Sequence, residues 1–282
     1  MEQNSKLTVG TVQPLAGNKL KVKIPVTTED PTPELGAGML AYVNNSLRIY
    51  TGTRWQGIDE GILPITDGLI TYLDASSTNS YPRNGNIWFN LASNSNAIGD
   101  FNLNNFTFLP DAGGAFRFNN GSATSSNYNA GSNGITMEVV MYNTVGDTRS
   151  QFGRILDWND SSMVHGSFAS NQFRSWINAG GSRSNEFEIN STQANYYDRW
   201  NHAVITYNKS AVIGYWNSTE TSNFAKTGDL ESTASPFTIG NGDSNAYYGL
   251  IGLVRIYNRA LSENEVAQNY NSLKTKYNLP AG

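Results

Sequence analysis

Three groups of aromatic and polar residues, in segments rich in Gly and Asn, carry the side chains that sugar binding requires. An aromatic ring offers a flat apolar surface to the C–H face of a sugar, while amide and carboxylate groups bond its hydroxyls. Binding residues concentrate in loops. We therefore predict carbohydrate contacts for one set of residues: Trp158, Asn159, Tyr196, Tyr197, Asn241, Asp243 and Tyr247.

Two of these segments, residues 157–161 and 241–245, are also dense in side-chain oxygens. Calcium takes six to eight oxygen ligands from carboxylates, amides and carbonyls. The candidate calcium ligands are Asp157, Asp160 and Asp243. Neither segment has the spacing of an EF-hand loop. The alternative is that these Asn and Asp side chains bond the backbone of their own turns.

Glu186 and Glu188 form a carboxylate pair with a spacing that glycoside hydrolysis could use. Residues i and i+2 share a face of a strand, and glycosidases place two carboxylates on either side of the scissile bond. The alternative is a solvated strand face. The sequence has no Cys and only two His, His165 and His202, and it lacks a G-x-S-x-G elbow. We therefore predict no enzymatic activity, with a glycoside hydrolase as the alternative.

The composition limits the classes of partner. Among 282 residues only 15% are charged, the net charge is −4 and the pI is about 5.2. Without a basic stripe the chain is not expected to bind nucleic acid, and without a run of eighteen apolar residues it is not expected to insert into a membrane. The 27 Gly and 15 Tyr suit short strands joined by polar turns.

Residues 1–60 are predicted to form a small β module. Residues 19–24 alternate Lys with apolar residues, and residues 39–43 and 46–50 are two strand patterns joined by Asn44-Asn45, which suits a hairpin. Residues 54–58 complete a meander. The stretch GMLAYVNNSLRIYTGTRW resembles segments of phage fibre and virion surface proteins, which implies a module that attaches the chain to a capsid or tail.

Residues 61–282 are predicted to form the second domain, an all-β sandwich. Strand patterns at residues 69–73, 135–142, 200–207 and 250–257 precede a short helix, for which Ser262 and Glu265 have the spacing of a capping box. Leu261 and Val266 have the spacing of a hydrophobic staple.

The order of these blocks over residues 66–280 resembles the laminin-G-like, concanavalin-A-like jelly rolls. The blocks are GLITYLDA, WFNL, WNHAVITY and the ending GLVRIYNRALS. The resemblance implies a jelly-roll sandwich that binds sugars or surfaces. The sequence departs from the pattern of these relatives in two segments that could bear on metal binding or catalysis. The segment at Phe118 lacks the acidic pair that many relatives carry, and the E-x-D-x-x-E signature of the laminarinase-type relatives is absent.

These observations lead to one expected function with two alternatives. Residues 1–6 lack the apolar core of a secretory signal, which fits a component of a phage particle released by lysis and equally fits a secreted protein whose signal has been removed. We predict a non-enzymatic virion surface protein, either a capsid decoration or a head or tail fibre subunit, whose jelly roll binds host or environmental glycans. A homo-oligomer is compatible with that role. The alternatives are a polysaccharide-degrading enzyme and a purely structural decoration protein.

Overall fold

The chain divides into two compact units, Met1–Gly61 and Ile62–Gly282. The computed structural model describes residues 26–27, 40–43, 46–50, 55–57, 63–129, 134–143, 153–158, 163–168, 172–189, 197–231, 234–242 and 245–280. The alternating segment predicted at residues 19–24 lies outside them. The two units are described separately below.

The described part of the first unit is a four-stranded sheet. Its strands are β1 (Val26–Thr27), β2 (Leu40–Val43), β3 (Ser46–Tyr50) and β4 (Trp55–Gly57), in that order. β2 and β3 form a hairpin in which Val43 pairs with Ser46, so that Asn44 and Asn45 connect them as a two-residue loop. β3 continues antiparallel to β4, and β1 runs parallel to β2.

The second unit is a sandwich of two antiparallel sheets. Sheet I follows the order β5 (Leu69–Asp74), β21 (Leu250–Tyr257), β9 (Ile135–Tyr142), β15 (Trp200–Tyr207), β16 (Ala211–Trp216) and β17 (Thr219–Ala225). Sheet II follows the order β6 (Ile87–Trp88), β7 (Phe101–Leu109), β8 (Ala115–Tyr128), β18 (Ser235–Ile239), β10 (Arg154–Trp158), β11 (Met163–Phe168), β12 (Gln172–Ala179) and β14 (Phe187–Ile189).

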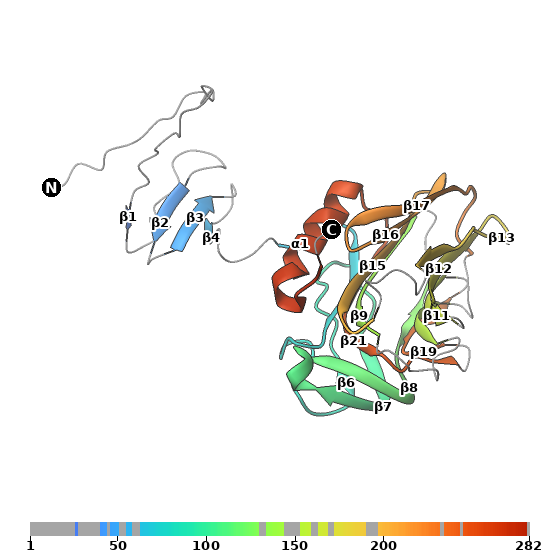
Figure 1. Ribbon diagram of the computed structural model, residues 1–282, viewed down its shortest axis with the longest axis horizontal. Helices are drawn as coiled ribbons and strands as arrows, with labels where there is room; N and C mark the ends of the chain where they lie inside the picture. Colours follow the sequence, from blue (N-terminus) through green and yellow to red (C-terminus); the bar gives the residue numbers. More distant parts are fainter. Residues whose placement is uncertain are drawn as a thin grey trace, which may run out of the picture. The chain divides into compact units, whose positions relative to one another are not determined.

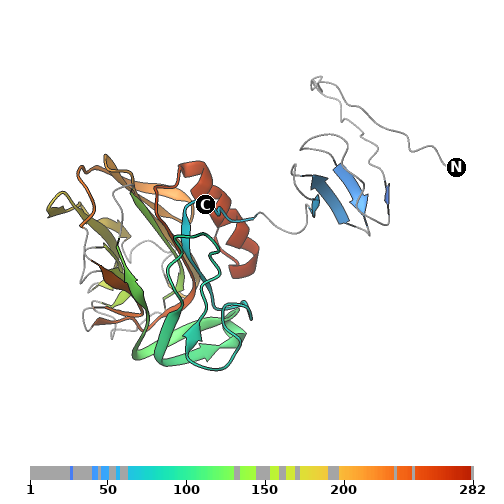
Figure 2. The same ribbon diagram turned by 180° about the vertical axis from the view of Figure 1, so that it is seen from behind.

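Short elements complete the sandwich. They are the 3₁₀ turn η1 (Pro110–Ala112), β13 (Ser182–Arg183), β19 (Asn241–Gly242) and β20 (Asn245–Ala246). A single pairing of Ile251 with Phe116 joins the two sheets at an edge. The helix α1 (Glu263–Tyr277) lies against sheet I on the side away from sheet II, as Figures 1 and 2 show.

The pattern of apolar residues in each strand follows from how many of its faces are buried. β21 is buried along its whole length and β9 along nearly all of it, because sheet II covers one face of sheet I and α1 covers part of the other. Strands buried on both faces read as continuous apolar runs. β14, by contrast, alternates between buried and exposed residues, as expected of a strand with one solvated face.

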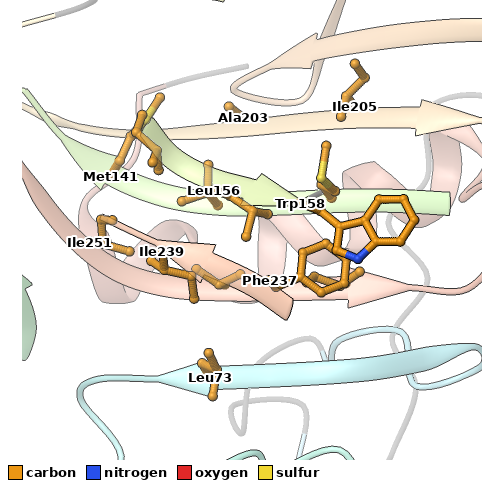
Figure 3. Packing of buried hydrophobic residues seen from close by; sticks show 14 of the residues in the cluster. Leu73, Met141, Leu156, Trp158, Ala203, Ile205, Phe237, Ile239 and Ile251 are labelled. Carbon is orange, nitrogen blue, oxygen red and sulfur yellow. The ribbon is translucent and has the colours of Figure 1, made fainter. Parts of the chain in front are cut away.

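The main core fills the space between the sheets. Sheet I contributes apolar side chains such as Met137, Val139 and Ile205, and sheet II contributes Leu156 and Phe237. Part of this packing is drawn in Figure 3. At Gly214 the sheets approach so closely that a Cβ atom would lie 2.4 Å from the Phe187 ring. A side chain at this position would therefore push the sheets apart.

The C-terminal helix is capped and packed as its sequence predicts. The Ser262 hydroxyl accepts a hydrogen bond from the Glu265 backbone N–H, and the Glu265 carboxylate accepts one from the Ser262 backbone N–H. Leu261 and Val266 belong to the same buried apolar cluster under the helix. Tyr270 is also buried. The predicted capping box and apolar face are therefore confirmed.

A fully buried polar network joins the helix to sheet I. Glu138 Oε1 accepts hydrogen bonds from Arg255 at 3.1 Å and from His202 Nε2 at 2.9 Å, and Glu138 Oε2 accepts one from Asn269 of α1 at 2.8 Å. Burial tends to raise the pKa of Glu138, but Arg255 and these hydrogen bonds outweigh it and the pKa lies below its ordinary value. His202 is completely buried, and its hydrogen bond to Glu138 makes it part of this network.

Candidate functional site

A row of six directly paired residues crosses the outer face of sheet II, the face turned away from sheet I. Each pairs with the next on the neighbouring strand: Asn102, Thr124, Thr238, Asp157, Val164 and Trp176. Core residues flank the row within the strands, as Phe237 and Ile239 flank Thr238. Five inter-strand steps of about 4.8 Å give the row a length of about 24 Å. The outer face therefore presents the polar side chains of Asn102, Thr124 and Thr238 towards one end of the row and an aromatic residue at the other end.

Trp176, at the end of this row, is covered by arginine side chains. Only 2% of Trp176 is exposed. The guanidinium carbon of Arg183 lies 3.6 Å from the centre of the Trp176 ring, and that of Arg154 lies 5.1 Å away. Guanidinium groups stack favourably on indole rings. Trp176 is therefore a fixed platform for charged groups on the outer face, in addition to packing in the sheet.

A tight hairpin brings Arg183 onto the ring. Ala179 of β12 pairs with Ser182 of β13, so Gly180 and Gly181 form a two-residue loop. Both glycines have positive φ, 57° and 74°, as the turns favoured in two-residue hairpins require. Arg183 pairs with Asn178, two residues beyond Trp176 on the same strand. A diagonal neighbour at that distance is within reach of a long side chain.

Arg174, Arg183, Glu186 and Glu188 form a cluster of ion pairs, called here the Arg174 cluster, beside Trp176. Arg174 lies 3.1 Å from Glu186 Oε2 and 3.2 Å from Glu188 Oε1, and Arg183 also pairs with Glu186. Between 23% and 44% of each side chain is exposed. The two glutamates share one face of the strand region, as their spacing predicts, and both are bound to the same arginine.

Within the Arg174 cluster, the pKa of Arg183 lies below its ordinary value. Burial lowers the pKa of Arg183, and the positive charges of Arg154 and Arg174 lower it further. Arg183 therefore lies in a locally positive environment. Arg154 itself lies 3.4 Å from Asp157 Oδ2, and both of these side chains are almost fully buried.

This arrangement can hold a polar ligand on the outer face. The guanidinium groups supply planar sets of N–H donors, and the glutamates supply acceptors for hydroxyl groups. The amide of Asn102 and the hydroxyls of Thr124 and Thr238 extend the polar surface across the sheet. As a set, these groups suit recognition of a hydroxyl-rich molecule by hydrogen bonds.

The structure gives Trp158 a place in the core. The sequence indicated a loop at residues 157–161, but Asp157 and Trp158 instead end strand β10, because they pair with β11 and β18. The Trp158 ring is fully buried, stacks on Phe237 at 5.9 Å and donates through Nε1 to the Ser235 carbonyl (Figure 3). The expected loop position is therefore wrong, and a ring covered in this way offers no face to a sugar.

Tyr197 and Tyr247 come together, around Asn143. Tyr197 pairs with Asn143 in an isolated bridge, and the Tyr247 hydroxyl donates to Asn143 Oδ1 at 2.6 Å. Tyr247 is 1% exposed and belongs to the core, whereas Tyr197 is partly exposed. Asn241, near the start of β10, donates to the Asn120 carbonyl at 3.3 Å. Trp158, at the other end of β10, is four residues or about 13 Å away along the strand.

The remaining predicted site residues, Asn159, Asp160, Tyr196 and Asp243, lie outside the described residues. Of the three predicted calcium ligands only Asp157 is described, and its neighbour is the guanidinium of Arg154. A cationic neighbour does not suit a calcium ligand. Among the residues that the structure describes, no three His, Asp or Glu side chains are grouped closely enough to hold a metal ion.

The sequence did not single out Arg174 or Arg183, and it indicated a core position for Trp176. The alternation of Arg174, Trp176 and Asn178 along one strand was the available signal, because these residues share a face. The Gly180-Gly181 pair then folds Arg183, Glu186 and Glu188 back beside them.

The fold and sequence match one family of known proteins. The model of the family described as the concanavalin A-like lectin/glucanases superfamily, of the laminin G type, matches residues 119–267, which is more than half of the chain. The chain belongs to this superfamily. The predicted jelly-roll fold is thereby confirmed. No curated protein sequence matches the chain.

Solved structures with this superfamily fold include toxin binding domains and a sialidase. The binding domain of Paraclostridial Mosquitocidal Protein 1 is 14% identical, with a TM-score of 0.58 over 76% of this chain and 56% of that one. The botulinum neurotoxin DC binding domain, solved with rat synaptotagmin II, is 15% identical, with a TM-score of 0.54 over 74% and 52%. Trypanosoma rangeli sialidase, solved with sialic acid, is 14% identical, with a TM-score of 0.55 over 85% and 45%.

At these identities the likeness concerns the fold alone. The chain spans about half the length of each of these structures. In the described part of the chain, no helix is long and apolar enough to cross a bilayer.

Proposed function

We propose that this chain is a non-enzymatic, glycan-binding surface protein of a phage particle, and that the outer face of sheet II receives the glycan. The observation that carries the glycan-binding part is the six-residue row, which ends at Trp176 beside the exposed Arg174 cluster. The superfamily includes lectins, and the row provides the polar groups that a lectin of this kind would use.

The geometry of the carboxylates favours binding over hydrolysis. A glycosidase needs one carboxyl group that can donate a proton to the leaving oxygen. Glu186 and Glu188 are instead both bound to one arginine, Arg174, at 3.1 and 3.2 Å. A glycoside hydrolase remains the alternative. Release of reducing sugar from laminarin by the wild-type chain, abolished in Glu188→Gln, would establish it.

A glycan array tests the binding function. The full chain is screened once with calcium and once with EDTA. Two variants are screened in the same way, each with a new arginine side chain, one on sheet II and one on sheet I. Thr124→Arg obstructs the second position of the row, next to Asn102, and Thr219→Arg places the same group on exposed β17. We expect specific binding that Thr124→Arg abolishes and Thr219→Arg retains. Absence of binding to any glycan in either buffer would support the purely structural alternative.

The attachment role belongs to residues 1–60 in this proposal. Support comes from the sequence resemblance of the hairpin segment and from the division of the chain after Gly61. Particles assembled with the chain lacking residues 1–60 test this role directly. Loss of the protein from purified particles is expected, and normal incorporation would refute the assignment.

A further inference from the structure

Arg183 is held in a fixed orientation on the outer face of sheet II. The Gly180-Gly181 loop sets its backbone, and its guanidinium carbon lies 3.6 Å from the ring centre of the buried Trp176. A flat guanidinium stacked on a fixed ring loses little further freedom when it binds a ligand. The side chain is nevertheless 44% exposed, so a ligand in solvent can reach it.

The hydrogen-bonding capacity of Arg183 is largely unused within the described residues. A guanidinium carries five N–H donors in a rigid fork. The one polar partner that the structure gives Arg183 is Glu186, which its Nη2 contacts. Nη2 carries two N–H groups, one parallel to Nε–H and one parallel to an Nη1 N–H, so a contact from one of them to Glu186 leaves the other edge of the fork open to an acceptor. Two parallel N–H groups match the two oxygens of a carboxylate.

Arg183 has two guanidinium neighbours, Arg154 and Arg174, each of which is also paired with a carboxylate. Glu186 is shared between Arg174 and Arg183, so one carboxylate faces two guanidinium groups. Arg154 lies against the same Trp176 ring, and the positive charges of Arg154 and Arg174 lower the pKa of Arg183. Glu188, which pairs with Arg174 and is 38% exposed, would repel a doubly charged phosphate more strongly than a carboxylate. It can accept a hydrogen bond from a sugar hydroxyl.

We infer that the glycan recognised by this chain carries a carboxylate, as a uronic acid does. Arg183 binds the carboxylate through the open edge of its fork, and Glu188 accepts a hydroxyl of the same or the next sugar. This inference rests on the proposed glycan-binding function and specifies its ligand class. It makes Arg183, which the sequence did not single out, the residue that determines specificity.

The test compares acidic oligosaccharides with their uncharged counterparts. Oligogalacturonate, oligomannuronate and hyaluronan fragments are each measured against the carboxyl-reduced form of the same oligosaccharide, using the full chain and isothermal titration calorimetry. We expect at least one acidic form to bind at least tenfold more tightly than its reduced form. We also expect this preference to weaken as NaCl is raised.

Two arginine variants assign the preference to a residue. Arg183→Lys keeps the charge but loses the fork, and we expect it to remove the preference for the acidic form. Arg199→Lys, at a partly exposed arginine before β15, is the matched control and is expected to keep it. Unchanged melting temperatures for both variants show that the fold is retained.

The outcomes separate the inference from the function on which it rests. Equal binding of acidic and reduced forms would overturn the inference and leave the glycan-binding function intact. An acidic preference that survives in Arg183→Lys would overturn the assignment to Arg183. Binding of none of these oligosaccharides, together with an empty glycan array, would refute the proposed function itself.

Discussion

At the scale of single residues, the protein has a buried group of charges around Glu138 and a partly exposed group in the Arg174 cluster. The two groups are expected to contribute differently to the stability of the fold. Glu138 is completely buried between sheet I and the helix, with Arg255 as its counter-ion and His202 and Asn269 as hydrogen-bond donors. Removing one member of a buried ion pair leaves the other charge without compensation. The Arg174 cluster is partly solvated, and pairs of that kind contribute little to stability.

We predict that Glu138→Gln destabilises the fold by about 3 to 5 kcal/mol, because Arg255 loses its buried counter-ion. Urea unfolding followed by fluorescence measures the change. The matched control is Glu220→Gln on the exposed strand β17, for which a change within about 0.5 kcal/mol is expected. A Glu138→Gln protein as stable as the control would show that the network does not hold the helix.

At the scale of elements, the helix α1 depends on its first turn. Hydrogen bonds from Arg259 lower the pKa of Glu265 to about 2, with further bonds from the backbone and hydroxyl of Ser262. The ordinary value is 4.5. Because the folded-state pKa is depressed, ionised Glu265 stabilises the fold fully above pH 4.5, and this contribution disappears as the pH falls towards 2.

We predict that Glu265→Gln lowers the free energy of unfolding by about 1 to 2 kcal/mol at pH 7, since a charged cap and its arginine partner are lost. The difference from wild type should shrink steadily between pH 4.5 and pH 2. Urea unfolding at pH 7, 4 and 3 measures it. A difference that stays constant across this range would mean that the carboxylate charge does not stabilise the helix.

Elements of the second unit were predictable from sequence, whereas the site was not. β9, β15 and β21 have the predicted bounds, because each is a mostly apolar segment of eight residues, as strands buried on both faces are. The site depends on which strands lie side by side. Thr124, Thr238 and Asp157 meet through pairings between strands far apart in the chain, and no local pattern encodes that register. Trp158 shows the converse, because pairing on both sides extended its strand into an apparent loop.

At the scale of the whole molecule, the two compact units have different tasks in the proposed function. All three buried apolar clusters lie within the second unit, between Leu69 and Leu279. The helix that closes sheet I also belongs to it. Among the described residues the sandwich therefore has a core of its own, as an independently folding domain requires.

We predict that a chain lacking residues 1–61 folds and unfolds cooperatively, with a urea midpoint within experimental error of the transition that the sandwich shows in the full chain. The physical reason is that the truncation removes no side chain from the three apolar clusters. Circular dichroism and tryptophan fluorescence during urea unfolding measure the midpoint. The same truncated chain should keep its glycan affinity, because Trp176 and the Arg174 cluster all belong to the second unit. A sandwich that loses its cooperative transition without residues 1–61 would show that the first unit supports the fold, and the attachment role would then need a different explanation.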